Sequence, residues 1–257
     1  MKVVILAGGY GTRISEESVY KPKPMIEIGG MPILWHIMKL YSKSGYNEFI
    51  ICAGYMQEVI KKWFADYFIH TSDITFDFTD NNKMIIHNKH TEPWKVTVVD
   101  TGLETNTGGR INRIKEYVSE DEFLLTYGDA VCDVDISEVV EFHRKHDKIA
   151  TLTAVMLQQD KGVLGIGADN AVHSFREKNQ NDGAPINAGF MVLKKEIFDY
   201  IKDDTTIFEK ESLEFLVEKG ELMSFVHKGY WQCMDTKREK DILENLWASN
   251  KAPWKVW

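Results

Sequence analysis

A cluster of glycines follows the first apolar run of the chain. Gly8, Gly9 and Gly11 come directly after the continuous β-branched run Val3–Ala7. Glycine lets main-chain N–H groups approach an anion closely, and open α/β folds bind ligands beyond the carboxyl ends of their parallel strands. The spacing therefore predicts a phosphate-binding loop, with a tight turn that binds nothing as the alternative. The loop fits neither the dinucleotide fingerprint, because Ile14 replaces its third glycine, nor the P-loop, because no Gly-Lys-Ser/Thr follows.

Three cations lie close to this loop in the sequence. Arg13, Lys21 and Lys23 stand within eleven residues of an otherwise acidic chain. Alternating prolines at positions 22 and 24 disfavour a helix, so we expect an extended segment that holds both lysines near the glycines at low entropic cost. Such a cluster suits a polyphosphate with two or three charges, such as a nucleoside triphosphate. A solvated loop stiffened by proline is the alternative.

The elements that must position these residues alternate between strand and helix. Residues 2–7 and 48–53 read as buried strands, and Pro32 and Gly45 bracket a helix. A second helix is predicted over 57–67, so the chain begins as a doubly wound α/β fold. Later elements continue the alternation: helix 111–118, strand 122–127, helix 136–146, strand 150–157, helices near 196–201 and 208–219, and a last helix over 237–247.

Two β-rich stretches interrupt this alternation. Short runs at 74–78, 84–87 and 96–100 have no helix between them, and short strands dominate from 163 to 192. We therefore predict one domain over residues 1–257, with β-rich excursions near 73–101 and 158–192.

The composition bounds the class of protein. Hydrophobic residues at 44% and charged residues at 27% match the globular average and exclude disordered and collagen-like chains. A formal net charge of −8 opposes binding to nucleic acid or acidic membranes. Cys52, Cys132 and Cys233 have the spacing of neither a disulfide framework nor a thiolate metal site. We therefore expect a cytoplasmic protein with no nucleic-acid partner. Because no apolar stretch approaches the ~18 residues of a membrane span, we also expect no membrane partner.

Several motifs taken together resemble one family. The segment Leu-Ala-Gly-Gly-Tyr-Gly-Thr-Arg at 6–13, followed by Lys-Pro-Lys-Pro-Met at 21–25, is similar to the signature of the sugar-1-phosphate nucleotidyltransferases. Segments 127–129, 177–178, 186–190 and 231–236 agree with that family, and segments 29–37, 92–94, 107–110 and 251–257 resemble its glucose-1-phosphate cytidylyltransferases. The resemblance runs end to end. It implies a Rossmann-like, mostly parallel mixed sheet with helices on both faces.

The resemblance also implies a reaction. A cytidylyl group would pass from CTP to α-D-glucose 1-phosphate, giving CDP-glucose and pyrophosphate by in-line attack on the α-phosphorus with Mg²⁺ as cofactor. By resemblance Lys23, Arg13 and Asp129 are catalytic, with Lys23 bridging the phosphates of the two substrates and Arg13 on the β- and γ-phosphates. Asp129 and Asp235 are implied as the metal ligands, and one or two carboxylates with phosphate oxygens are what Mg²⁺ commonly takes.

The remaining site residues are implied in the same way. The nucleotide would be bound by Leu6, Gly8, Gly9, Gly11, Thr12, Arg13, Lys23, Thr107, Gly108 and Arg110. The sugar phosphate would be bound by Tyr127, Gly162, Glu177, Lys178 and Asn187. The resemblance suggests a homo-oligomer, either a trimer or a hexamer, and the tryptophans of segment 251–257 are equally consistent with a core anchor and a subunit contact.

Four positions near the predicted sugar site depart from the cytidylyltransferase pattern. These are Asp160, Lys161, Asn179 and Ala188. Because of these departures, the acceptor could instead be another sugar phosphate. The donor could likewise be UTP or dTTP. A catalytically silent nucleotide-sugar-binding regulatory protein is the alternative of a different class. Because the predicted catalytic and metal-binding residues are all present, the sequence favours an enzyme.

Two other groups of polar residues receive structural interpretations. Asp133 and Asp135 precede the predicted helix 136–146, so we expect them to cap it. His143 and His146 have the spacing of metal ligands but lack a third ligand, so we expect a solvated polar pair instead of a zinc site.

Overall fold

The computed structural model describes residues 1–89, 91–156, 163–166, 172–176 and 184–257. Its strands are β1 (Val3–Ala7), β2 (Glu27–Ile28), β3 (Met31–Pro32), β4 (Glu48–Ala53), β5 (Ser72–Asp77), β6 (Lys83–Lys89), β7 (Lys95–Asp100), β8 (Glu122–Tyr127), β9 (Ala130–Cys132), β10 (Ala150–Met156), β11 (Val163–Ile166), β12 (Val172–Arg176), β13 (Pro185–Asn187), β14 (Met191–Lys194), β15 (Leu222–His227) and β16 (Trp231–Cys233). Its α-helices are α1 (Ser15–Ser18), α2 (Ile33–Lys43), α3 (Gln57–Thr71), α4 (Thr107–Arg113), α5 (Ile136–His146), α6 (Leu213–Lys219) and α7 (Lys237–Ala248). Four 3-10 turns, η1 (Thr12–Ile14), η2 (Lys23–Met25), η3 (Lys115–Tyr117) and η4 (Lys195–Tyr200), and one π turn, η5 (Phe208–Ser212), complete the described elements.

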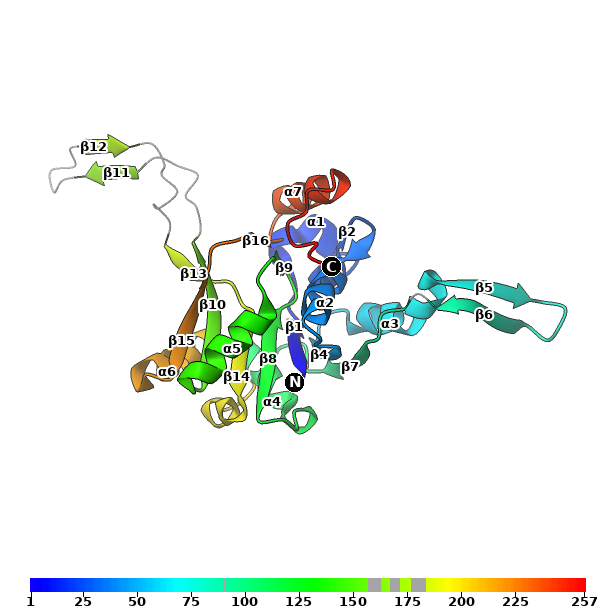
Figure 1. Ribbon diagram of the computed structural model, residues 1–257, viewed down its shortest axis with the longest axis horizontal. Helices are drawn as coiled ribbons and strands as arrows, with labels where there is room; N and C mark the ends of the chain where they lie inside the picture. Colours follow the sequence, from blue (N-terminus) through cyan, green and yellow to red (C-terminus); the bar gives the residue numbers. More distant parts are fainter. Residues whose placement is uncertain (90, 157–162, 167–171, 177–183) are drawn as a thin grey trace.

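The central sheet is mixed, with a parallel core. Its strand order is β13-β10-β14-β8-β1-β4-β7, and β15 also pairs with β10. Strand β1 runs parallel to β4 and β8, and β4 runs parallel to β7. Strand β14 is antiparallel to β8, and β10 is antiparallel to β13 and β14. Helices cover both faces of this sheet (Figure 1), as predicted.

The apolar run of β1 is continuous because both faces of the strand are buried. Val3, Ile5 and Ala7 belong to the core that contains the apolar side of α2, while Val4 and Leu6 belong to the core under α4 and α6. No residue of this strand is more than 8% exposed. Strand β1 is therefore a rigid support for the glycine loop that follows it.

The chain reverses its direction of winding at β1. It proceeds from β1 to β4 and then to β7 on one side, and it returns to β8 on the other side of β1. Neighbouring loops diverge at such a switch point and leave a crevice beyond the carboxyl ends of the strands. Gly8 follows β1 and Gly128 follows β8, and the Gly128 N–H donates to the Leu6 carbonyl at 2.9 Å.

The excursions differ in extent from the prediction. Strands β5 and β6 form an antiparallel hairpin that projects away from the body (Figure 1), but the third run, β7, returns to the central sheet. In the later stretch, β11 pairs with β12, whereas β13 and β14 join the central sheet. Strand β15 was not predicted; the exposed Ser224 and Val226 on it break the buried pattern that marks the other central strands.

The expected extended form of the Lys-Pro-Lys-Pro segment is wrong at Lys23. Pro22 is extended, but Lys23 begins the 3-10 turn η2, in which the Met25 N–H donates to the Pro22 carbonyl at 2.8 Å. Proline is tolerated in the first turn of a helix because the N–H that it lacks has no helical partner there. The turn buries Lys23, whereas Lys21 remains outside and pairs with Glu27 at 2.7 Å.

Candidate active site

A cavity of about 560 Å³ opens at the carboxyl ends of β1 and β8. This volume lies in the range of small-molecule binding sites. Most of the predicted nucleotide and metal residues line it, namely Leu6, Gly8, Gly9, Gly11, Thr12, Arg13, Lys23, Thr107, Arg110, Asp129 and Asp235. Tyr127, predicted to bind the sugar phosphate, lines it as well. Residues that were not predicted also line it, among them Tyr10, Glu104 and Glu209.

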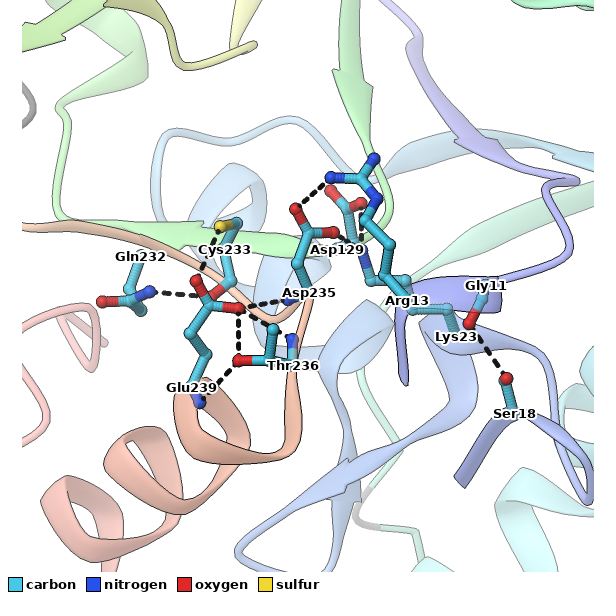
Figure 2. A network of polar contacts seen from close by, with 10 residues as sticks. All are labelled: Gly11, Arg13, Ser18, Lys23, Asp129, Gln232, Cys233, Asp235, Thr236 and Glu239. Atoms are coloured by element: carbon cyan, nitrogen blue, oxygen red, sulfur yellow. Dashed lines mark hydrogen bonds and ion pairs between the residues drawn. The ribbon is translucent and has the colours of Figure 1, made fainter. Parts of the chain in front are cut away.

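The charged end of the cavity is a network of two carboxylates and two cations (Figure 2). Lys23 Nζ donates to Asp129 Oδ2 at 2.7 Å and also to Asp235 Oδ1. The Arg13 guanidinium reaches the other oxygen of Asp235 at 2.6 Å. Residues from the beginning, middle and end of the chain thus meet within one hydrogen-bonded group.

Lys23 keeps its charge in this network although it is only 8% exposed. Burial works against the ammonium form, but the charges and hydrogen bonds of Asp129 and Asp235 outweigh it and raise the pKa of Lys23 above its ordinary value. A lysine so held is a fixed positive charge at neutral pH, suited to neutralising phosphate oxygens.

Asp235 is held in place through its backbone. The Met234 N–H donates to the Asp129 carbonyl at 2.9 Å, and the Asp235 N–H donates to Glu239 Oε2 at 2.8 Å. Glu239 also completes a capping box with Thr236 at the start of α7 (Figure 2). Sequence reasoning missed Glu239, although the Thr-x-x-Glu spacing at 236–239 is the signal for such a cap.

The glycine loop lies directly against Arg110. A Cβ on Gly8 would lie 2.1 Å from a guanidinium nitrogen of Arg110, so any larger residue would displace the Arg110 side chain. This guanidinium donates to Thr101 Oγ1 at 2.8 Å and to the Gly102 carbonyl at 2.6 Å, and burial lowers its pKa. Arg110 therefore lies between the glycine loop that follows β1 and the loop that follows β7, and it lines the cavity there.

The other end of the cavity is a chain of hydrogen bonds centred on one carboxylate. Thr107 Oγ1 donates to Glu209 Oε2 and the Tyr127 hydroxyl donates to Glu209 Oε1, each at 2.7 Å. The Asn187 amide donates to the Tyr127 hydroxyl at 3.4 Å. Burial, reinforced by the Glu209 charge, raises the pKa of Tyr127, so its hydroxyl stays protonated. No local pattern points to Glu209, because its partners lie 82 and 102 residues away.

Comparison with known proteins agrees with this geometry. The family model described as Nucleotidyl transferase matches residues 2–245. This chain belongs to the nucleotidyl transferase family. It is 56% identical to the glucose-1-phosphate cytidylyltransferase of Salmonella typhimurium and 40% identical to the probable glucose-1-phosphate cytidylyltransferase of Bacillus subtilis, each over the whole of both chains.

A solved structure shares the fold. The crystal structure of HddC from Yersinia pseudotuberculosis superposes with a TM-score of 0.68 at 26% identity, covering 96% of this chain and 99% of that one. The family and the Rossmann-like fold predicted from the sequence are therefore confirmed.

The carboxylates of this nucleotidyl transferase fit a divalent cation. Asp129 and Asp235 come from different loops, yet an oxygen of each bonds to the same ammonium nitrogen. Carboxylate oxygens that converge on one positive centre beside a cluster of phosphate-binding groups are the arrangement that Mg²⁺ takes in phosphoryl-transfer sites. The predicted pair is therefore compatible with the metal that the family implies.

Two predicted residues that the structure describes, Gly108 and Asn187, are not among those that line the cavity, although Asn187 bonds to Tyr127, which does. Gly108 lies under the site, where its N–H donates to the Thr206 carbonyl at 3.0 Å and an added Cβ would meet Thr206 at 2.8 Å. Gly162, Glu177 and Lys178 lie outside the described residues, as do Asp160, Lys161 and Asn179. Ala188 is buried, and its carbonyl accepts from Trp231 Nε1 at 3.1 Å.

The structural interpretations of the other polar residues require two corrections. Asp135 caps α5 by accepting from the Ser137 N–H at 2.8 Å, as predicted. Asp133 is not a cap, because its carboxylate accepts instead from His227 at the end of β15 and from the Tyr230 N–H before β16. His143 and His146 are not a solvated pair: His143 is fully buried, and both rings bond to the Thr151 hydroxyl.

The cysteines form no disulfide, and the tail packs into the core of its own chain. All three cysteines are free thiols, and Trp254 of the tail is 1% exposed within its own chain, which favours the core anchor over the subunit contact. In the described part of the chain, no helix has both the length and the apolar character to cross a bilayer.

Proposed function

We propose that this nucleotidyl transferase transfers a cytidylyl group from CTP to α-D-glucose 1-phosphate, producing CDP-glucose and pyrophosphate. A phosphate oxygen of the sugar phosphate attacks the α-phosphorus, and the bond from that phosphorus to the oxygen of the leaving pyrophosphate breaks. The observation that carries the proposal is the convergence of Lys23, Asp129 and Asp235 in a cavity of a chain that is 56% identical, end to end, to a glucose-1-phosphate cytidylyltransferase.

The charged end of the cavity would position the reacting phosphates. In phosphoryl and nucleotidyl transfer the protein mainly aligns two anions and neutralises charge. Lys23 has the most buried side chain of the four charged residues, and it supplies the fixed charge where the phosphates of both substrates meet. Arg13, whose side chain is 77% exposed, is placed to meet the β- and γ-phosphates. The N–H groups of the glycine loop add donors that need no counter-charge.

Asp129 and Asp235 would hold Mg²⁺. The ion, when bound, supplies charge neutralisation at the phosphate oxygens. When the aspartates hold the ion, Lys23 would exchange its two carboxylate partners for phosphate oxygens. The ammonium group that bonds to both aspartates in the free protein would then be available to the substrates.

The hydrogen-bonded end would hold the neutral parts of the substrates. Thr107 borders the predicted nucleotide site, and Tyr127 and Asn187 border the predicted sugar phosphate site. Glu209 joins the two groups, so it fixes the spacing between the site of the donor and that of the acceptor.

We further predict a cytoplasmic homo-oligomer. The β5–β6 hairpin supports self-association, because Phe76 is 51% exposed and Phe78 is 79% exposed at its surface. Apolar rings displayed in this way are typical of contact surfaces. Light scattering on a Phe76→Ser/Phe78→Ser double variant should show a lower mass than the parent protein, and an unchanged mass would exclude the hairpin from the contact.

Pyrophosphate release over a grid of substrates tests the proposed function. CTP, UTP, dTTP and GTP are each paired with glucose, galactose and mannose 1-phosphates. CTP with glucose 1-phosphate should have the highest kcat/KM, because each unpaired polar group left by a wrong hydroxyl costs about 1–3 kcal/mol. A specificity constant more than tenfold higher for another pair would overturn the assignment of that substrate, and no turnover with any pair would favour a regulatory protein.

A further inference from the structure

Asp133 lies at the far end of the strand that begins beside Asp129. Strand β9 separates the two aspartates, and it pairs with β16, which leads into Asp235. The Asp133 carboxylate accepts from the Tyr230 N–H and from His227 Nε2, each at 2.7 Å. The Asp133 N–H donates to the Tyr230 carbonyl at 3.1 Å. Two hydrogen bonds through Tyr230 therefore attach the turn that enters β16 to the end of β9, and His227, the last residue of β15, supplies a third.

The two-stranded ladder connects this attachment to the active site. Trp231, Gln232 and Cys233 pair in turn with Cys132, Val131 and Ala130. The next bond, from the Met234 N–H to the Asp129 carbonyl at 2.9 Å, comes directly before Asp235. Three paired residues span only about 10 Å, so a displacement at one end is transmitted to the other.

The attachment is closely packed. A Cβ added at Gly229 would lie 2.4 Å from Asp133 Oδ1 and 2.7 Å from His227 Nε2. A side chain at this position would therefore displace the Asp133 carboxylate or the His227 ring, so glycine allows the observed close approach.

We propose that Asp133 is a positioning residue that sets the register of β16 on β9 and thereby holds the Asp235 carboxylate beside Asp129. The ladder is too short to define its own register, and a slip of one residue would send alternate side chains to the opposite face. In the observed register Lys23 bonds to both carboxylates. The inference rests on the proposed function only in treating this pair of aspartates as the metal site.

Asp135 offers a matched control. Both aspartates accept from one backbone N–H, Asp133 from Tyr230 at 2.7 Å and Asp135 from Ser137 at 2.8 Å. They lie two residues apart, but the Asp135 carboxylate caps α5, whereas the Asp133 carboxylate bonds to the turn before β16. Removing either carboxylate should lower the melting temperature by a few degrees, since each change removes a side-chain acceptor. Only the Asp133 change should affect the metal site.

The readout is binding of Mn²⁺ to the protein with CTP and without sugar phosphate, measured from the loss of the free Mn²⁺ EPR signal and corrected for CTP alone. Asp133→Ala should weaken Mn²⁺ binding roughly tenfold or more, as loss of a residue that orients metal ligands typically does. Asp135→Ala should leave it unchanged within twofold. Wild-type affinity in folded Asp133→Ala, or equal weakening in both variants, would overturn the proposal.

Two further variants keep the test decisive. Gly229→Ala forces the turn away from an intact Asp133 and should weaken Mn²⁺ binding in the same way, so the proposal is tested even if Asp133→Ala does not fold. Asp129→Ala tests the metal site itself. If Asp129→Ala weakens binding and neither Asp133→Ala nor Gly229→Ala does, the positioning role alone fails; if Asp129→Ala has no effect, the assignment of the metal site fails.

Discussion

The cavity and the C-terminal tail are both assembled from distant parts of the chain, yet they are built on opposite principles. In the cavity, charges compensate one another and remain partly open to solvent, with Asp129 33% and Asp235 22% exposed. In the tail, Trp254 packs among aromatic rings that include His36, and both residues are 1% exposed. Ion pairs near water can exchange partners when an anion arrives, whereas closely packed rings cannot rearrange without loss of stability. The first arrangement suits the binding of an anion, and the second suits a stable core.

The tail packs against a histidine of α2, His36, that is held neutral. His36 Nε2 bonds to the Ile28 carbonyl at 2.8 Å, and Trp254 Nε1 donates to His36 Nδ1 at 3.3 Å. One ring nitrogen therefore donates and the other accepts, which describes a neutral imidazole. Burial lowers the pKa of His36 to about 4. His36 is thus neutral in the core, whereas Lys23 is charged in the cavity. Substitutions in the core should therefore change stability, and substitutions in the cavity should change catalysis.

The largest expected effect is on folding. Trp254→Ala should reduce the free energy of unfolding by about 3–5 kcal/mol, because it removes a fully buried ring. Urea denaturation measures the loss, and light scattering should show an unchanged mass since the ring packs within its own chain. Trp257→Ala, which removes a partly buried ring of the same tail, should cost less. A smaller assembly in Trp254→Ala would contradict the interpretation of the tail as a core anchor.

The next effect is on catalysis. Lys23→Ala or Asp129→Ala should lower kcat by on the order of a hundredfold or more, as loss of a charge-stabilising group in a preorganised site does. Unlike Trp254→Ala, these variants should unfold at nearly the parent urea concentration. Lys21→Ala is the matched control, because this lysine pairs with Glu27 outside the cavity and its loss should leave turnover unchanged. Parent-like turnover in folded Lys23→Ala would remove this lysine from the mechanism.

Acid should reveal the buried histidine. Its folded pKa, about 4, lies below the ordinary 6.5, so its contribution to stability is complete above pH 6.5 and is lost as the pH falls toward 4. The difference corresponds to about 3 kcal/mol once both states are protonated. Urea denaturation at pH 7 and pH 4 should show a smaller acid loss for His36→Gln than for the parent. Equal losses in the two proteins would mean that other groups account for acid sensitivity.

The smallest expected effect lies at the hydrogen-bonded end of the cavity. In the parent protein, each carboxylate oxygen of Glu209 accepts from one hydroxyl, that of Thr107 or that of Tyr127. Glu209→Gln replaces one of these oxygens by an NH2 group, so one hydroxyl loses its acceptor. We expect KM for the sugar phosphate to rise about tenfold, the equivalent of one lost hydrogen bond in a partly buried site, with a smaller change in kcat. Glu211→Gln, two residues away and outside the cavity lining, should change neither constant. A loss confined to kcat would place Glu209 among the groups that act on the reacting phosphates.

Local features of the sequence determined much of the fold and one side of the site. The continuous β-branched run predicts β1, proline and glycine bracket α2, and the strand predicted over 122–127 coincides with β8. The glycine loop and Lys23 are recognisable because backbone freedom and charge density are properties of neighbouring residues. Their motif was also sufficient to indicate the family.

Only the tertiary structure decided which groups work together. Lys21 and Lys23 are alike in sequence, but a single 3-10 turn buries Lys23 between two carboxylates and leaves Lys21 outside. Asp133 and Asp135 both resemble helix caps, yet the partner of Asp133 lies 97 residues away at Tyr230. Glu209 carries no local signal because its bonds to Thr107 and Tyr127 form only when β8, α4 and η5 come together. Sequence periodicity reports the backbone and its burial, whereas hydrogen-bond partners so distant along the chain are selected by how the elements pack.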